Sequence, residues 1–185
     1  MKTKVLYDGI VIIEDLGINH KDLFKEIKVR STWDESIKSR KTVSYGIPYN
    51  YSQITYKTTK FPKHIANLAK SVKTIIGFNP NNCLVNFYEF NESKMGFHSD
   101  QIDILEPHTG IVIFSLGASR IMRFKNKDDG KTFDIKMKPD SLCYMTQDLQ
   151  KKWLHSILPS NQSIKSERIS LLLEILQNCN EYLKT

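Results

Sequence analysis

The stretch GIVIFSLGASRIMRFKNKDDGKTFDIKMKPDSLCYM, residues 110–145, decides the fold class that the sequence predicts. It holds apolar or alternating runs at 110–116, 121–124, 132–137 and 142–145, and their lengths are typical of strands rather than helices. Asp128-Asp129-Gly130, between two alternating runs, is typical of a hairpin turn. We therefore expect a series of short strands here.

Outside this stretch, further strand signals lie at 84–90 and 169–175, with shorter ones at 5–7 and 10–13. Two helices are expected before residue 84: one with Asn19 as its N-cap, and one that has Pro62 as its first residue and stops at Gly77. Apolar residues recur at helical spacing in both, namely Leu23, Phe24 and Ile27, then Ile65, Leu68, Val72, Ile75 and Ile76. The pattern indicates a mainly β fold with supporting helices, of sandwich or jelly-roll type.

The length of 185 residues fits a single domain covering residues 1–185. Cys83, Cys143 and Cys179 lack the close spacing of a zinc site, so reduced thiols are expected. The apolar stretch 10–13 is too short for a signal peptide, and no run is long enough to span a membrane. We expect a soluble, cytoplasmic, monomeric protein.

The net charge is positive, because 27 Lys and Arg residues oppose 20 Asp and Glu residues to give +7. Such a charge favours approach to a polyanion such as DNA or RNA. No block of basic residues dominates, however, and a solvated basic surface is the simpler explanation.

One set of residues could hold a metal. His98 and Asp100 are two apart, so in a strand they point to the same side, and His155 follows later in the chain. Two imidazoles and one carboxylate on one face of an ion are the ligands of non-haem iron(II) oxygenases, which leave positions open for co-substrate and oxygen. The alternative is that both histidines are ordinary surface or core residues.

Arg168 is the second candidate, because it opens the apolar run 169–173 and would sit at the start of a strand. A guanidinium placed inside the fold requires an anion, and its planar fork fits the distal carboxylate of a keto-diacid. The alternative is a surface ion pair with Glu167 or Glu174.

Taken together, five linked motifs resemble the AlkB-like oxygenases in order and spacing. They are residues 84–88 (LVNFY), 96–100 (GFHSD), 115–120 (SLGASR), 153–157 (WLHSI) and 168–171 (RISL). An upstream segment with Arg40, Tyr45, Tyr49 and Tyr51 also resembles the substrate-binding segment of that family, so the likeness covers about residues 40–175. The resemblance implies a double-stranded β-helix that uses Fe(II), 2-oxoglutarate and O2.

The resemblance also implies roles for single residues. Asn86 and Tyr88 would hydrogen-bond 2-oxoglutarate, Arg168 would pair with its distal carboxylate, and Ser170 would make a weaker contact. For the first two, ordinary strand residues satisfied by neighbours are the alternative. Trp153 and Arg120 match motif positions, and packing is expected for Trp153. The expected substrate residues are Arg40, Tyr45, Tyr49, Tyr51 and Gln101.

Three positions depart from the family pattern. Glu174 stands where the closing strand usually carries a second arginine, and Leu172 stands where threonine is frequent. Gln101 and Ile102 stand where members acting on bases tend to have an acidic residue. Three hypotheses follow: a demethylase for alkylated DNA or RNA bases, a hydroxylase of a small molecule, amino acid or peptide, and a binding protein without turnover. The last is the weakest, because His98, Asp100, His155 and Arg168 are all present.

Overall fold

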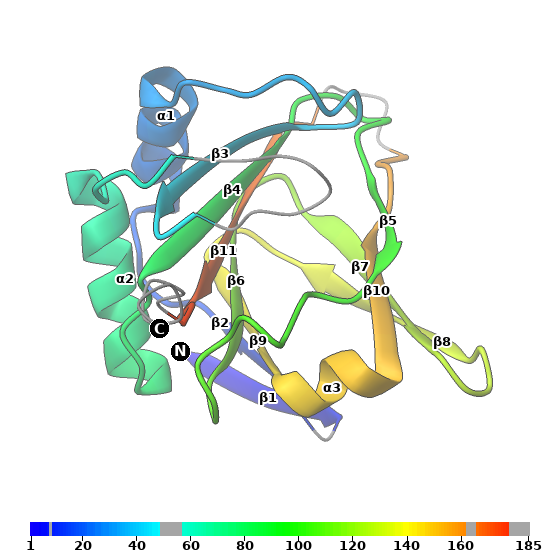
Figure 1. Cartoon of the computed structure of the whole chain (residues 1–185). Coiled ribbons are helices and arrows are strands. Elements are labelled where there is room, and N and C mark those ends of the chain that lie inside the picture. The colour runs from blue at the N-terminus through cyan, green and yellow to red at the C-terminus, as the bar shows by residue number, and fades with distance from the viewer. Residues whose placement is uncertain (8, 49–56, 162–165, 178–185) are drawn as a thin grey trace.

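The protein is seen here in a computed structural model that describes residues 1–7, 9–48, 57–161 and 166–177. Within these ranges two antiparallel sheets face each other, with an apolar cluster between them (Figure 1). The larger sheet has the order β1-β2-β9-β6-β11-β4-β3, and its strands are β1 (Lys2–Tyr7), β2 (Ile10–Glu14), β9 (Ser141–Thr146), β6 (Gly110–Gly117), β11 (Arg168–Glu174), β4 (Asn82–Tyr88) and β3 (Lys41–Gly46). The smaller sheet has the order β5-β10-β7-β8, and its strands are β5 (Met95–His98), β10 (Trp153–Ile157), β7 (Arg120–Asn126) and β8 (Thr132–Met137).

Strand β11 shows how the core is divided. It lies between β6 and β4, and all of its residues are buried. Because neighbouring side chains in a strand point to opposite faces, Leu172 joins the apolar cluster between the sheets. Ile169, Leu171 and Leu173 join a second cluster on the outer face of the larger sheet. A strand buried on both faces reads as a continuous apolar run, which is why the sequence predicted it clearly.

Two helices cover that outer face, α1 (His20–Arg30) and α2 (Lys63–Ile76) (Figure 1). The Asn19 side chain caps α1 by accepting a hydrogen bond from the Asp22 N–H, as expected. Pro62 precedes α2 as its N-cap residue and is not the first helical residue, which corrects the sequence prediction by one position. Gly77 ends α2 with a φ of 96°, which glycine adopts without a Cβ penalty.

The double-stranded β-helix is confirmed, and every predicted strand run has a counterpart in the structure. The sequence did not predict β3, β5, β10 or the short helix α3 (Gln147–Lys152). Their apolar patterns are brief: β5, for example, is four residues long and none of them is buried. In the described part of the chain, no helix is long and apolar enough to cross a membrane. Tyr49, Tyr51 and Cys179 lie outside the described residues.

Gly117 joins β6 to the turn before β7 and lies beside the residue that precedes β11. Its φ is 78°, and a Cβ there would lie 2.5 Å from the Glu167 carbonyl oxygen. That oxygen accepts a hydrogen bond from the Ala118 N–H, so it cannot move away freely.

We predict that Gly117→Ala lowers the free energy of unfolding by at least about 2 kcal/mol, because it combines backbone strain with a backbone collision. Gly77→Ala is the matched control: its φ is also positive, yet nothing lies within 4 Å of the added Cβ. Urea unfolding of both variants measures the difference. If both variants lose the same free energy of unfolding, the structure relieves the backbone collision at Gly117 without a measurable energetic cost, and the prediction is wrong.

Candidate active site

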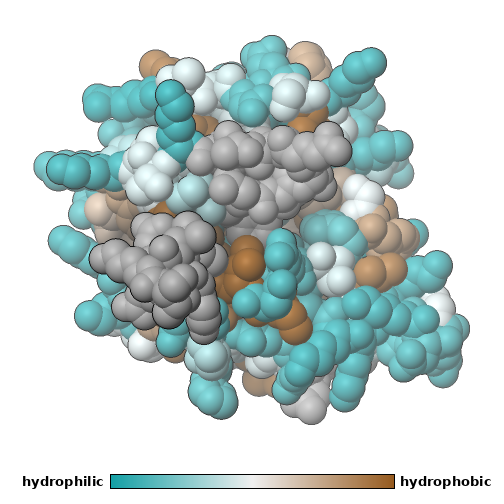
Figure 2. All heavy atoms as spheres, viewed as in Figure 1, coloured by the Kyte–Doolittle hydropathy of each residue, from teal (hydrophilic) through white to brown (hydrophobic). Residues whose placement is uncertain are grey.

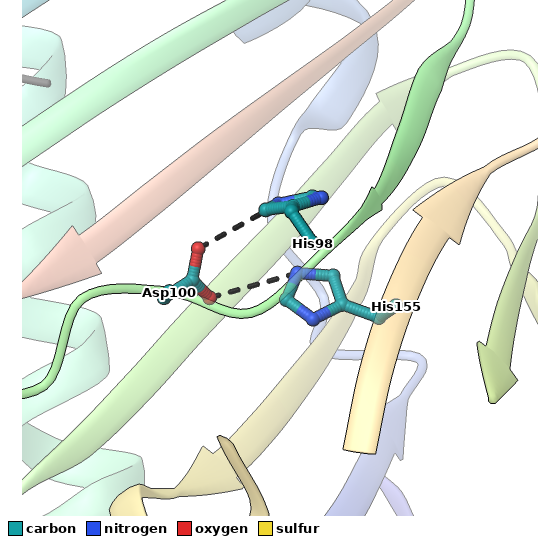
Figure 3. A group of neighbouring side chains, drawn as sticks. All are labelled: His98, Asp100 and His155. Atoms are coloured by element: carbon teal, nitrogen blue, oxygen red, sulfur yellow. Dashed lines mark ion pairs between the residues drawn. The ribbon is translucent and has the colours of Figure 1, made fainter. Parts of the chain in front are cut away.

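Three side chains meet between the sheets, two of them from paired strands. His98 ends β5 and lies directly opposite His155 on β10, while Asp100 follows β5 by two residues. His98 Nε2 lies 3.7 Å from Asp100 Oδ1, and His155 Nε2 lies 3.6 Å from Asp100 Oδ2 (Figure 3). One donor atom from each residue can be chosen so that all three lie within 4.8 Å of one another. The arrangement leaves room for a single cation.

The chemistry of these donors fits a divalent metal. Asp100 Oδ2 is buried and has no hydrogen-bond partner in the described structure, a costly state unless a cation compensates it. His98 Nδ1 lies 2.8 Å from the Gly96 carbonyl oxygen, which can only accept, so Nδ1 carries the proton and Nε2 keeps its lone pair. His98 and His155 each have their Nε2 on the side of the Asp100 carboxylate.

His155 is held in the uncharged form that binds metals. Its side chain is 4% exposed, and burial lowers its pKa to about 4, although the Asp100 carboxylate acts in the opposite direction. A neutral imidazole at neutral pH competes poorly for protons and so remains available as a ligand.

Asp100 is positioned from its backbone by a buried glutamine. Gln150, in α3, accepts a hydrogen bond from the Asp100 N–H at 3.0 Å and is 3% exposed. Lys127 donates to the Gln150 carbonyl oxygen and to Ser99 Oγ, at 2.7 and 3.2 Å. These contacts tie the loop that carries Asp100 to α3 and to the segment that follows β7.

The three residues line a cavity of about 410 Å³. Its wall is otherwise largely apolar, with one polar side formed by β4 and β11. The lining includes Arg40, Asn86, Tyr88, Gln101, Arg168 and Ser170. Of the twelve residues expected at the site, nine therefore border this one cavity. Tyr49 and Tyr51 are among the undescribed residues, and Tyr45 lies elsewhere.

Arg168 is fully buried at the start of β11 and is incompletely paired. Its Nη2 donates to Ser115 Oγ at 3.1 Å, while Nε and Nη1 have no partner in the described structure. The guanidinium carbon lies 5.3 Å from the centre of the Tyr88 ring, and burial lowers the pKa of Arg168 from its ordinary value. A buried guanidinium with unused donors beside a cavity fits the carboxylate of a ligand.

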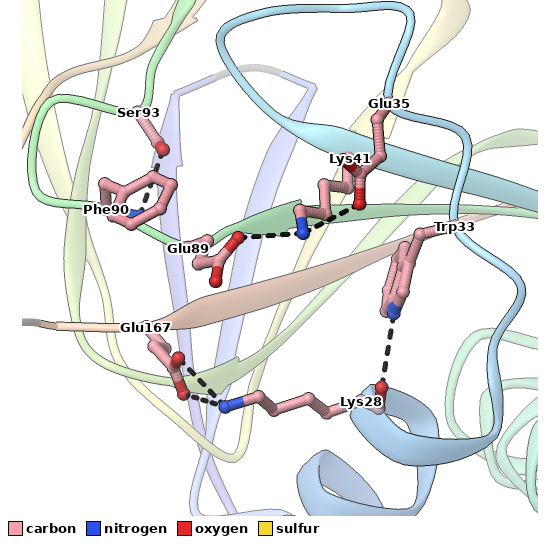
Figure 4. A network of polar contacts seen from close by, with 8 residues as sticks. All are labelled: Lys28, Trp33, Glu35, Lys41, Glu89, Phe90, Ser93 and Glu167. Carbon is pink, nitrogen blue, oxygen red and sulfur yellow. Dashed lines mark hydrogen bonds and ion pairs between the residues drawn. The ribbon is translucent and has the colours of Figure 1, made fainter.

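The alternative partners of Arg168 are excluded. Glu167 instead binds Lys28 of α1, with Nζ–Oε distances of 2.9 and 2.7 Å (Figure 4). Glu174, at the far end of β11, is fully buried, and neither of its carboxylate oxygens has a partner among the described residues. Burial raises its pKa well above the ordinary value, and the Asp100 carboxylate adds to the rise. Glu174 does not line the cavity, whose wall on this strand ends with Leu172.

Tyr45 does not line the cavity, unlike Arg40 of the same segment. Its hydroxyl lies 3.0 Å from Ser31 Oγ, and its ring packs against the outer apolar cluster. It lines a separate hollow together with Glu26 and His64. The side-chain alternation of β3 therefore directs Tyr45 away from the cavity.

Two further motif residues support the fold around the site. Arg120 is buried and donates to the carbonyl oxygens of Phe90, Asn91 and Ser166. Trp153 packs edge-on against Phe133, as expected from the sequence. The hydrogen bonds of Arg120 hold the loop after β4 and the residues before β11, while the Trp153–Phe133 contact joins β10 to β8.

Sequence reasoning assigned no role to Phe97, which the structure places on the cavity wall. It is 44% exposed, and Lys125 Nζ lies 5.9 Å from the centre of its ring. The only signal for Phe97 in the sequence was its position next to His98.

On the viewed face of the molecule the surface is mostly hydrophilic, with small separate hydrophobic areas (Figure 2).

Comparison with known proteins gives one family. The sequence model of the 2OG-Fe(II) oxygenase superfamily matches residues 12–173. A protein described as "Uncharacterized protein R406", from Acanthamoeba polyphaga mimivirus, is 26% identical over 152 residues, which cover 80% of this chain and 78% of that protein. A solved structure described as "The structure of OsALKBH1" superposes with a TM-score of 0.73 over 94% of this chain and 100% of that chain, at 15% identity. This last likeness concerns the fold.

We predict that His155→Gln weakens Fe(II) binding by at least about 100-fold, because one of three ligands is lost while the side-chain volume is kept. Anaerobic titration with Fe(II) measures the affinity, and circular dichroism checks the fold. His108→Ala, an exposed histidine outside the cavity, is the control and should bind Fe(II) like the parent. Unchanged affinity in His155→Gln would exclude His155 as a ligand.

The lowered pKa of His155 also predicts a pH dependence of stability in metal-free protein. As the pH falls from 6.5 toward about 4, the unfolded chain takes up a proton that the folded protein does not, so stability is lost in this window. The loss attributable to this group between pH 7 and pH 5 is about 2 kcal/mol. Urea unfolding in a chelator at both pH values measures it. His155→Gln should show a smaller decline, and an identical decline would contradict the assignment.

Proposed function

This chain belongs to the 2OG-Fe(II) oxygenase superfamily, and on that premise we propose that it is an oxidative demethylase of alkylated nucleic-acid bases. The observation that carries the proposal is the convergence of His98, Asp100, His155 and Arg168 on one cavity. A metal triad and a buried guanidinium in the same cavity are what an oxygenase that uses a keto-diacid requires.

The protein is a dioxygenase whose cofactors are Fe(II), 2-oxoglutarate and O2. When bound, these supply the oxidative decarboxylation of 2-oxoglutarate to succinate and CO2 and the hydroxylation of a substrate carbon. We assign the iron to His98, Asp100 and His155. Arg168 offers its unused Nε and Nη1 donors to the distal carboxylate of the co-substrate, and Asn86, Tyr88 and Ser170 line the same wall.

The remaining wall excludes water from this chemistry. Apolar side chains from both sheets surround the polar groups just described. These apolar residues are Leu84, Met95, Ile113, Met122, Ile157 and Leu172. In such a setting the charges of the ligand interact more strongly with Arg168 than they would in water.

Two features of the cavity support an alkylated base as substrate. Phe97 is an exposed aromatic ring beside a metal ligand, and a flipped or single-stranded base can stack on such a ring. Lys125 lies beside it, and the chain carries a net charge of +7, which favours a polyanion. Hydroxylation of an N-methyl group on the base would give a hemiaminal that releases formaldehyde.

A second candidate is hydroxylation of a small molecule, amino acid or peptide. Among the described residues that line the cavity, Asp100 is the only carboxylate, and it is assigned to the metal. Gln101 presents an uncharged amide instead. A positively charged alkylated base would therefore meet no free acid there, which favours a neutral or anionic substrate.

Substrate-dependent turnover distinguishes the two candidates. Succinate and formaldehyde are measured with single-stranded oligonucleotides bearing N-methylated bases, with their unmethylated counterparts, and with free amino acids, nucleosides and peptides. We predict that only the methylated oligonucleotides stimulate both products. Stimulation by the small molecules alone would replace the demethylase with the second candidate.

In the same assay, Phe97→Ala should lower kcat/KM for the methylated oligonucleotide by about 10-fold or more, because base stacking on an aromatic ring is lost. Phe90→Ala is the matched control, since Phe90 is similarly exposed but does not line the cavity. Equal effects of the two substitutions would remove Phe97 from the substrate site.

A further inference from the structure

We infer that Arg40 is a positioning residue of the co-substrate site: it fixes the Asn86 amide so that its NH2 group is available to the anion in the cavity. The inference rests on the proposed use of this cavity by 2-oxoglutarate, and it moves Arg40 from the substrate side, where the sequence placed it, to the co-substrate side.

The hydrogen bond between the two side chains determines which way the amide faces. Arg40 Nε lies 2.7 Å from Asn86 Oδ1. A guanidinium only donates, so its partner must be the amide oxygen, and the amide nitrogen is left for other contacts. Asn86 is 4% exposed and lines the cavity, and the side-chain hydrogen bond described for it is made by its oxygen, Oδ1. The oriented amide thus offers donors, as a carboxylate requires.

The register of the larger sheet connects this pair with Arg168. Asn86 on β4 lies directly opposite Ser170 on β11, and Tyr88 lies directly opposite Arg168. Arg40, Asn86, Ser170 and Arg168 all line the cavity. They form a continuous polar row along one wall, with guanidinium groups in it from two distant segments. A keto-diacid with a carboxylate at each end matches such a row.

Charge supports the same assignment. Among the described residues that line the cavity, Arg40 and Arg168 are the only Arg or Lys residues. Position 174 is a glutamate and not a second arginine, and it lies beyond Leu172, outside the cavity wall. Strand β11 therefore contributes one guanidinium to the cavity, that of Arg168. The second cation of the cavity, Arg40, thus acts on a bound dianion through the Asn86 amide that it orients.

The backbone before β3 is anchored strongly enough to position a side chain. Lys41 Nζ lies 2.8 Å from Glu35 Oε1 and 3.0 Å from Glu89 Oε2, which joins the start of β3 to the end of β4 (Figure 4). Asp34 and Thr42 exchange two backbone hydrogen bonds. Arg40 immediately precedes Lys41 and lies inside the loop that the Asp34–Thr42 pair closes, so its side chain starts from a fixed backbone.

Binding of 2-oxoglutarate in the presence of Mn(II), measured by anaerobic calorimetry, tests the inference without turnover or a known substrate. We expect Arg40→Ala to weaken 2-oxoglutarate by about 10-fold or more, as the loss of a charge-assisted bond implies, while Mn(II) affinity stays unchanged. Arg40→Lys keeps a cationic donor and should recover part of the loss. Arg30→Ala, an exposed arginine of α1 outside the cavity, should bind like the parent.

A double-mutant cycle separates positioning from general charge. If Arg40 acts through Asn86, Arg40→Ala should have little further effect in an Asn86→Ala background. Additive losses, or parent-like affinity of Arg40→Ala, would overturn the inference. The thermal midpoint and circular dichroism of each variant confirm folding. If Arg40→Ala is unstable, the 2-oxoglutarate affinity of Arg40→Lys replaces it in the comparison with the parent.

The same measurements separate this inference from the proposed function. Failure of the parent protein to bind 2-oxoglutarate with Mn(II), or full binding by Arg168→Met, would contradict the proposed function itself. If the parent binds, Arg168→Met does not, and Arg40→Ala binds normally, only the role of Arg40 is wrong. If Arg40→Ala instead raises the KM of the primary substrate and leaves the 2-oxoglutarate affinity unchanged, Arg40 contacts the substrate and not the co-substrate site.

Discussion

The registered pairing of β11 with β4 and β6 is the constraint on which the rest of the structure depends. This strand is buried on both faces, so its alternate residues must serve two environments. Ile169, Leu171 and Leu173 pack under the helices, while Arg168 and Ser170 face the cavity. A shift of one residue would bury the guanidinium under the helices and turn the apolar row into the cavity, so the register is strongly determined.

Several polar groups of the site are buried without the hydrogen-bond or ionic partners that a bound ligand would supply. Within the part of the chain that the structure describes, two nitrogens of Arg168 and one buried carboxylate oxygen of Asp100 have no hydrogen-bond partner. Each such group costs free energy in a ligand-free barrel, and the surrounding packing and hydrogen bonds keep it in place. The unpaired donors of Arg168 indicate that the site would accept an anion. The unpaired carboxylate oxygen of Asp100 indicates that it would accept a cation.

The two sheets have different tasks. The smaller sheet and the loop after β5 bring His98, Asp100 and His155 together, with Gln150 fixing the Asp100 backbone. The larger sheet supplies the polar row to which we assign the co-substrate. Because the cavity lies between the sheets, their packing sets the distance between metal and co-substrate groups. Gly117 and the Lys28–Glu167 pair hold the start of β11, and with it Arg168, in this relation.

The sequence by itself determined the strand-rich fold, the His98 and Asp100 spacing, the place of His155 and the position of Arg168 at the start of a strand. These are local properties, set by a period of two and by residue type. Only the tertiary structure decided that Arg40 contacts Asn86, that Tyr45 faces the outer hollow, and that Glu174 lies beyond the cavity wall. Such outcomes depend on which strands pair and in which register, and short strands such as β3, β5 and β10 carry too little local pattern to fix that pairing alone.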